Sequence, residues 1–131
     1  MNNKKIVLIT EDEAALRSAL YDKLLAEGFS VFEAKNGEEG LEIALREHPD
    51  LILIDILMPK MDGLTMLKKL RENSWGKKAH FIILTNVNDV KELAKAIVIA
   101  QVKDNESFEY FVKSDTKIES VVDAIKRKLM L

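Results

Sequence analysis

Leu51-Ile52-Leu53-Ile54-Asp55 is the stretch of sequence that decides the fold: four aliphatic residues followed by a single carboxylate. It is bounded by His48-Pro49 before it and Met58-Pro59 after it. A short, continuous apolar run between such residues is typical of a strand that is buried on both faces. Such a strand lies in the middle of a sheet with helices on either side. Asp55 then stands at the strand's C-terminal end, where open α/β sheets bind their ligands.

The composition is that of one soluble domain. The chain has 131 residues, of which 47% are hydrophobic and 32% charged, and its net charge of −2 supplies no basic field for nucleic acid or an anionic membrane. The absence of cysteine excludes disulfides and favours a cytoplasmic location. No apolar run is long enough to span a bilayer. We therefore expect a single domain over residues 1–131, without membrane insertion or direct nucleic-acid binding.

Strand and helix patterns alternate along the chain. Aliphatic runs predict strands at residues 6–9, 31–34, 51–55, 81–84 and 108–112. Leucines and other apolar residues at helical spacing predict a helix after each strand. Asn88 or Asp89 can cap the fourth helix, which should run to about Val102. Asn36-Gly37 is interpreted as a turn, and Thr116 with Glu119 has the spacing of a capping box.

Five successive strand–helix units imply a parallel sheet with right-handed crossovers and helices on both faces. The strand at 51–55 is rich in aliphatic residues and should be central, whereas the mixed strand at 31–34 suits an edge. This favours a flavodoxin-like, doubly wound α/β fold with five strands in the order 2-1-3-4-5. Its ligand crevice lies between the first and third strands.

Chemically active side chains stand where the predicted strands end. In chain order they are Glu11, Asp12, Asp55, Thr85 and Lys113. Three carboxylates at one edge repel one another unless a cation lies among them, and such oxygen ligands suit Mg²⁺ better than Zn²⁺. An aspartate beside the metal can attack phosphorus and form an aspartyl phosphate. Lys113 would neutralise the phosphoryl oxygens, and the Thr85 hydroxyl would hydrogen-bond to one of them.

These motifs, in this order, resemble the receiver domains of two-component response regulators. The matching stretches are Glu11-Asp12, Asp55 with Met58-Pro59 and Asp62-Gly63, Thr85, and Tyr110-Phe111-Val112-Lys113. The resemblance covers essentially the whole chain. It implies that Asp55 accepts a phosphoryl group from a sensor histidine kinase or a phosphotransfer protein, in a reaction that requires Mg²⁺.

The resemblance also implies the metal ligands. Asp12, Asp55 and the backbone carbonyl of Leu57 would bind Mg²⁺ directly, and Glu11 would bind it through water. In receivers, the side chains at Leu57 and Val87 flank the approach of the water that hydrolyses the aspartyl phosphate. Neither side chain can orient a water here, so we expect slow autodephosphorylation from a protein that assists its own phosphorylation but is not a conventional enzyme.

By the same resemblance, Thr85 and Tyr110 form a switch pair that acts together with Lys113. Phosphorylation would be relayed to the face made by the fourth helix, the fifth strand and the last helix. A downstream protein or a second copy of the chain would bind there. Tyr110 also has a simpler interpretation as a core residue, which the sequence alone does not exclude.

Departures from the family pattern support a second interpretation, a receiver-like interaction module that no longer switches. Ser114 follows Lys113, where the family commonly has a proline in a cis peptide. Asn86 follows Thr85, where a small residue is usual, and the segment before the fifth strand is longer than typical.

Other functions and roles fit less well. A flavodoxin is disfavoured because the acidic stretch Thr10-Glu11-Asp12-Glu13 would repel a phosphate. A phosphatase of the haloacid dehalogenase type is disfavoured because Leu57 occupies the position of its second aspartate. We assign Glu13 only to the start of the first helix, where the macrodipole favours an acid, and Asp62 to the cap of the third.

Overall fold

The chain folds into one parallel sheet with helices on both faces. The computed structural model describes residues 4–86, 90–100 and 109–130. The strands are β1 (Ile6–Thr10), β2 (Ser30–Ala34), β3 (Leu51–Asp55), β4 (Phe81–Thr85) and β5 (Tyr110–Val112). The α-helices are α1 (Ala14–Ala26), α2 (Gly37–Glu47), α3 (Gly63–Glu72), α4 (Val90–Ala100) and α5 (Ile118–Met130). Two short 3₁₀ helices are η1 (Gly76–Lys78) and η2 (Lys113–Asp115).

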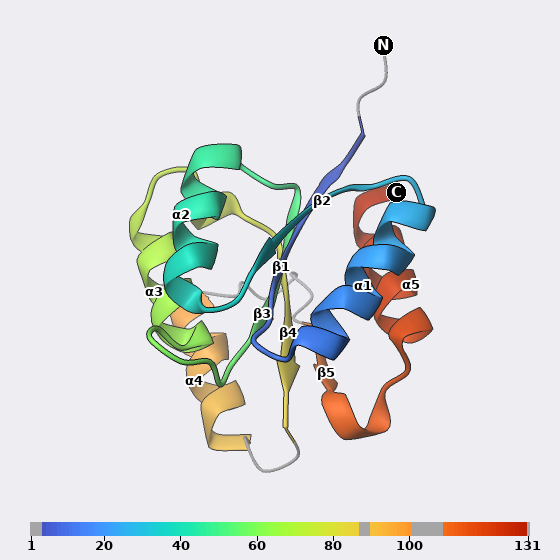
Figure 1. Cartoon of the computed structure of the whole chain (residues 1–131). Helices are drawn as coiled ribbons and strands as arrows, with labels where there is room; N and C mark the ends of the chain where they lie inside the picture. Colours follow the sequence, from blue (N-terminus) through green and yellow to red (C-terminus); the bar gives the residue numbers. More distant parts are fainter. Residues whose placement is uncertain (1–3, 87–89, 101–108, 131) are drawn as a thin grey trace.

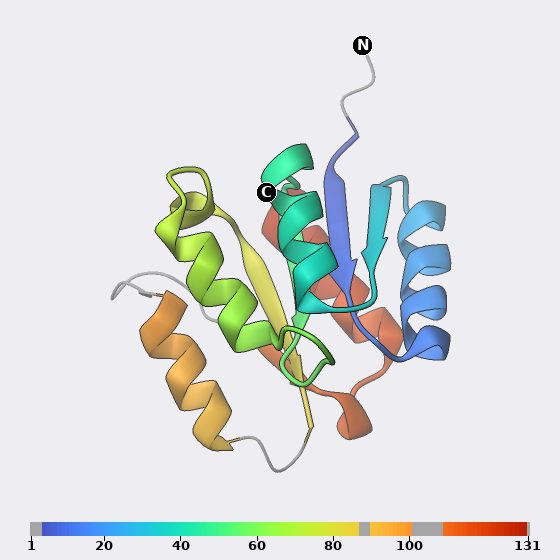
Figure 2. The same ribbon diagram turned by 60° about the vertical axis from the view of Figure 1, so that its left-hand side comes forward.

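The strand order is β2-β1-β3-β4-β5, and every neighbouring pair is parallel. Figures 1 and 2 show α2, α3 and α4 on one face of the sheet and α1 and α5 on the other. The predicted flavodoxin-like fold is therefore confirmed. No helix within the described ranges is long and apolar enough to cross a membrane.

Each face of the sheet buries its own apolar core, because successive side chains of a strand point to opposite faces. In β3, Ile52 and Ile54 belong to the core under α2, α3 and α4, whereas Leu51 and Leu53 belong to the core under α1 and α5. All four side chains are fully buried. Burial of each of these side chains stabilises the folded chain by about 1.5–3 kcal/mol. This double burial explains why the most aliphatic strand occupies the centre.

The loop from β3 to α3 folds tightly against the end of β3. Asp62 caps α3, as expected, by accepting a hydrogen bond from the Thr65 N–H at 2.8 Å. Gly63 donates its N–H to the Ile56 carbonyl at 2.8 Å. A Cβ atom at residue 63 would lie 2.3 Å from the Asp55 carbonyl oxygen, so this close approach requires glycine.

Two local interpretations of the sequence were wrong. Asn36 is not a simple turn residue but the N-cap of α2, where its side chain accepts a hydrogen bond from the Glu39 N–H at 2.9 Å. Thr116 forms no capping box, because α5 begins only at Ile118. The η2 turn instead brings the Thr116 hydroxyl to the Val112 carbonyl, to which it donates a hydrogen bond at 2.7 Å.

Candidate functional site

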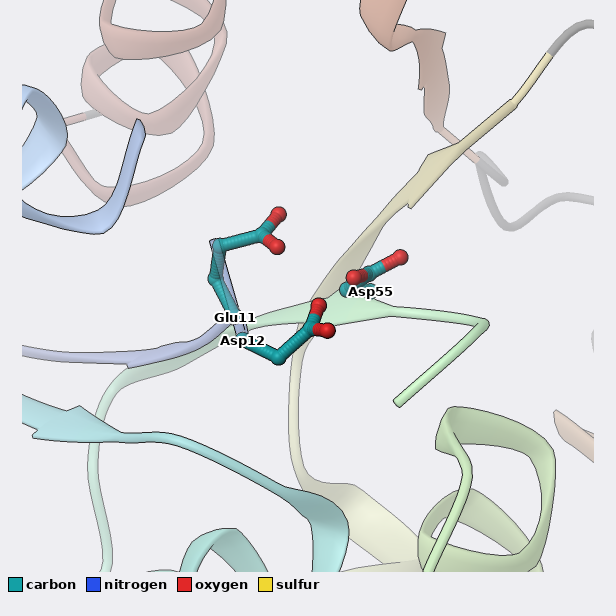
Figure 3. A group of neighbouring side chains, drawn as sticks. All are labelled: Glu11, Asp12 and Asp55. Atoms are coloured by element: carbon teal, nitrogen blue, oxygen red, sulfur yellow. The ribbon is translucent and has the colours of Figure 1, made fainter. Parts of the chain in front are cut away.

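Three carboxylates meet at the C-terminal edge of the sheet. Glu11 and Asp12 directly follow β1, and Asp55 is the last residue of the neighbouring β3. One oxygen from each carboxylate lies within 4.8 Å of the other two. Figure 3 shows the three side chains gathered at the ends of the two strands. Glu11 and Asp55 are buried, whereas Asp12 is exposed.

Backbone contacts fix the loop that carries the acidic pair. The Glu11 N–H donates to the Ala34 carbonyl at 3.0 Å, which extends the pairing of β1 with β2. The Arg17 guanidinium donates to the Glu11 carbonyl at 2.8 Å. The Glu13 N–H donates to Oε2 of Glu11 at 3.0 Å. The Glu11 carboxylate therefore accepts a hydrogen bond from its own loop, and it accepts another from Lys113.

Lys113, which directly follows β5, also reaches the carboxylates. Its Nζ donates to Oδ2 of Asp55 at 2.9 Å and to Oε2 of Glu11 at 3.1 Å, and its side chain is only 12% exposed. The Lys113–Ser114 peptide is trans, since no cis peptide bond occurs in the described residues. Lys113 therefore reaches Asp55 without the cis geometry that the family pattern suggests.

Nζ of Lys113 also donates to Oε2 of Glu13 at 3.3 Å. The prediction that assigns Glu13 only to the start of the first helix omits this contact with Lys113. Glu13 is the N-cap residue of α1, but its side chain makes no capping hydrogen bond. No spacing rule in the sequence points to this contact, because the two residues lie 100 positions apart.

Burial and the neighbouring charged groups shift the pKa of the Asp55 carboxyl. Burial and, next, the negative charge of Glu11 raise the pKa of the Asp55 carboxyl to about 8, although Lys113 acts in the opposite direction. Burial by itself lowers the pKa of Lys113, but its hydrogen bonds to Glu11 and Asp55 raise the pKa above its ordinary value. With Glu13, four carboxyl groups at this edge of the sheet outnumber the one ammonium of Lys113.

This excess of negative charge fits a hard divalent cation. Oε1 of Glu11 is buried and makes no hydrogen bond in the described residues, although it lies 2.9 Å from Nζ of Lys113. The donors are carboxylate oxygens, and Asp12 is open to solvent that can complete the coordination. Such a donor set suits Mg²⁺. The residues present therefore fit this metal.

The remaining predicted residues differ in how they relate to this cluster. Thr85, the last residue of β4, is buried, and its hydroxyl donates to the Asn86 carbonyl at 3.2 Å. Leu57 donates its N–H to Oδ1 of Asp55 at 3.3 Å, and its side chain is 51% exposed. Tyr110 is 49% exposed, so its interpretation as a core residue is wrong. Val87 lies outside the described residues.

Comparison with known proteins agrees with this geometry. A family model described as the response regulator receiver domain matches residues 7–106. Sporulation initiation phosphotransferase F of Bacillus subtilis (strain 168) is 32% identical over 131 residues, a match that covers 100% of this chain and 98% of the relative. The chain belongs to the response regulator receiver family.

Other receivers are similar over most of this chain. The probable transcriptional regulator ycf27 of Porphyridium aerugineum is 32% identical over 96% of this receiver, which spans only 50% of that relative. A CheY-like receiver domain protein of Methanospirillum hungatei is 26% identical, with a TM-score of 0.82 and coverage of 97% of this chain and 94% of the other. Chemotaxis protein CheY4 of Vibrio cholerae, at 24% identity and a TM-score of 0.83 over 97% and 100% of the chains, shows the shared fold.

In this receiver, four of the predicted site residues come together in one cluster. They are Glu11, Asp12, Asp55 and Lys113. Thr85 ends the strand beside Asp55, in keeping with the predicted position, while Tyr110 lies on the edge strand β5. The roles of these residues and the Leu57 carbonyl as a metal ligand stay predictions. Among the described residues, sequence reasoning missed the contact of the Glu13 carboxylate with Lys113 and that of the Arg17 guanidinium with the Glu11 carbonyl.

Proposed function

We propose that this receiver is a phosphorylation-activated switch whose phosphoryl acceptor is Asp55. The observation that carries the proposal is the setting of this carboxyl. It is 1% exposed, it accepts a hydrogen bond from Lys113 at 2.9 Å, and it lies beside Glu11 and Asp12. A buried carboxylate with both an ammonium and further metal-binding oxygens beside it is suited to attack phosphorus.

The reaction transfers a phosphoryl group from a phosphohistidine to Asp55. A carboxylate oxygen of Asp55 forms a bond to phosphorus while the bond from phosphorus to the imidazole nitrogen breaks. The electron pair of the broken bond stays on that nitrogen, which then takes a proton from solvent. Lys113 keeps its charge beside the transferred oxygens, and the hydroxyl of Thr85 becomes their hydrogen-bond donor.

Mg²⁺ fits the same edge of the sheet. Asp12, Asp55 and the Leu57 carbonyl would hold it, with Glu11 reaching it through water. The bound metal supplies positive charge that neutralises the phosphoryl oxygens.

The phosphodonor in this proposal is a sensor histidine kinase or a phosphotransfer protein. The phosphorylated form would act on a downstream protein, or on a second copy of the chain, through the face of α4, β5 and α5. The receiver promotes its own phosphorylation and slow dephosphorylation without acting on a separate substrate. Support for these partners comes from membership of the receiver family.

A second candidate is a receiver-like interaction module that no longer switches. The observation that favours it is the contact of the Thr85 hydroxyl with the Asn86 carbonyl at 3.2 Å. A switch would require that hydroxyl to turn toward the phosphoryl group. A module that cannot make this change would take up phosphate without altering its partner surface.

Labelling with a small phosphodonor tests the acceptor. In the presence of Mg²⁺, intact-mass measurement should show one phosphoryl group on the wild-type chain and none on Asp55→Asn, because no other carboxyl in the described part of the chain has the same contacts. Removal of Mg²⁺ with EDTA should abolish uptake. Asp115→Asn is the matched control, since Asp115 is an exposed acid in η2, close to Lys113 in sequence. Equal labelling of Asp55→Asn and the wild type would refute the assignment.

Backbone amide NMR shifts, measured with beryllofluoride and Mg²⁺, separate the two candidates. A switch should show shifts that extend from Asp55 to α4 and β5, whereas a non-switching module should show shifts at the site alone. Trp75 is an unsuitable reporter for this purpose. Its ring stacks on His48, with centroids 4.4 Å apart, in the loops that precede β4 and β3 at the opposite edge of the sheet.

A further inference from the structure

We propose that Glu13 is a positioning residue for phosphoryl transfer, which holds the Lys113 ammonium and competes with the incoming phosphoryl oxygens for it. This proposal deepens the function above and rests on it. The Glu13 carboxylate does not form the hydrogen bond that its N-cap position suggests. An N-cap side chain ordinarily accepts a hydrogen bond from the N–H groups of the first turn. Glu13, at the N-cap of α1, makes no such bond.

The Glu13 carboxylate instead lies against Lys113. Its Oε2 is 3.3 Å from Nζ, while Glu11 and Asp55 also accept hydrogen bonds from the same nitrogen. An ammonium has three N–H donors. In this arrangement all three donors of Lys113 are directed to carboxylates, and none remains for a phosphoryl oxygen.

The three partners differ in how easily they can give up their contact. The side chains of Glu11 and Asp55 are 0% and 1% exposed, but that of Glu13 is 61% exposed. Water can solvate the Glu13 carboxylate when its contact breaks, whereas the two buried groups lack this compensation. Glu13 is therefore the partner that a phosphoryl group displaces most readily.

The Glu13 charge has two effects on transfer. While its contact is intact, Glu13 keeps Nζ drawn toward the exposed side of the site and withholds one donor from the transferring group. Its negative charge also repels an anionic phosphodonor that approaches Lys113, an effect that salt screens. Both effects slow phosphorylation, and both disappear when the charge is removed with little change of shape.

Glu13→Gln tests the proposal, with Glu38→Gln as the matched control. Glu38 is also an exposed acid at the start of a helix, in the first turn of α2, but it is not among the partners of Lys113 in the described chain. At saturating Mg²⁺ and low salt, Glu13→Gln should accept phosphoryl groups from acetyl phosphate about 3- to 10-fold faster than the wild type. High salt should reduce the difference, and Glu38→Gln should match the wild type. An unchanged rate in Glu13→Gln, or an equal gain in Glu38→Gln, would overturn the proposal.

A readout without phosphorylation separates this inference from the proposed function. In the metal-free protein, the side-chain ¹⁵Nζ resonance of Lys113 should shift in Glu13→Gln and stay in place in Glu38→Gln. The midpoint of thermal unfolding should move little, because Glu13 makes no capping hydrogen bond. Failure of the wild type to accept a phosphoryl group would refute the proposed function. The Lys113 resonance would still show whether Glu13 contacts the ammonium. An unshifted Lys113 resonance would overturn the inference on its own.

Discussion

At the scale of single residues, the lifetime of a phosphorylated Asp55 depends on the side chains that border it. Hydrolysis needs a water held in line with the phosphorus. The N–H of Leu57 donates to Oδ1 of Asp55 at 3.3 Å, but its side chain is aliphatic and 51% exposed. It offers no group that binds a water. Val87, which the family resemblance predicts to flank the same approach, is aliphatic as well.

We therefore predict slow autodephosphorylation, which the double variant Leu57→Asn with Val87→Glu should accelerate. The loss of water positioning costs on the order of 1–3 kcal/mol of barrier, so the gain in rate should be roughly ten- to a hundredfold. Decay of the phosphorylated protein can be followed by intact mass after removal of the donor. Leu25→Asn is the control, since Leu25 is also an exposed leucine but lies on α1. A wild-type half-life of seconds that the double variant leaves unchanged would contradict the prediction.

Residue positions at the site were predictable to different degrees. Asp55 and Lys113 could be found because parallel strands deliver their C-terminal residues to one edge, and strand ends are visible in the sequence. Glu13 could not be found, since the direction of an exposed side chain depends on where Lys113 lies, 100 positions away. The burial of Tyr110 could not be predicted either. A tyrosine on an edge strand such as β5 can be exposed, whereas one on an inner strand is covered by its neighbours.

At the scale of elements, α4 is unusual for the apolar surface that it exposes. Ala96 is buried, and Leu93 and Ile99 pack against the core. Outside this stripe, Val98 is 77% exposed and Ile97 is 45% exposed. A surface helix ordinarily has one apolar stripe, so these additional residues favour contact with a partner or a second copy. The alternative, that the segment before β5 covers them, concerns residues 101–108, which lie outside the described ranges.

We predict that beryllofluoride with Mg²⁺ promotes self-association through α4, and that Val98→Glu weakens it. Burial of one such side chain is worth about 1.5–3 kcal/mol, so the dissociation constant should rise at least about tenfold. Sedimentation velocity over a range of concentrations measures the change. Leu45→Glu, at an exposed leucine of α2, should leave association unaffected. A wild type that sediments as a strict monomer, with and without beryllofluoride, would exclude self-association.

The elements themselves followed from the sequence better than their ends did. Strands and helices are set by apolar periodicity, which the chain displays clearly. Helix ends are set by single hydrogen bonds, such as those of Asn36 and Thr116, and several residues nearby can offer them. The 3₁₀ turn after β5 moved the start of α5 beyond Thr116, and no periodicity signals such a turn.

At the scale of the whole molecule, the fold supplies the free energy that holds an unfavourable site together. The two apolar cores fix β1 and β3 side by side, so Glu11 and Asp55 cannot separate to relieve their repulsion. The carboxyl of Asp55 responds by keeping its proton, with a pKa raised to about 8 by burial and by Glu11. Ionisation of this site is thereby linked to the stability of the entire domain.

The last prediction concerns the stability of the metal-free protein between pH 4 and 8. Below its ordinary pKa of 3.8, the Asp55 carboxyl is protonated in both folded and unfolded chains. Above that value the unfolded chain loses the proton and the folded chain keeps it, so rising pH favours unfolding until the folded pKa of about 8 is passed. Asp55 alone then lowers the free energy of unfolding by up to about 1.4 kcal/mol per pH unit. Lys113 adds no slope here, because its raised pKa loses stability only above its ordinary value of 10.5.

Urea denaturation in EDTA at several pH values measures this slope. Asp55→Asn cannot ionise, so its stability should fall less steeply with pH and should exceed that of the wild type at pH 8. Mg²⁺ should restore stability to the wild type, because the metal binds the ionised carboxylate and offsets the cost of removing its proton. Mg²⁺ should stabilise Asp55→Asn much less, because this variant has lost a charged ligand. Equal slopes for the two proteins in EDTA would show that Asp55 is already ionised in the folded chain, held by Lys113 against both its burial and Glu11.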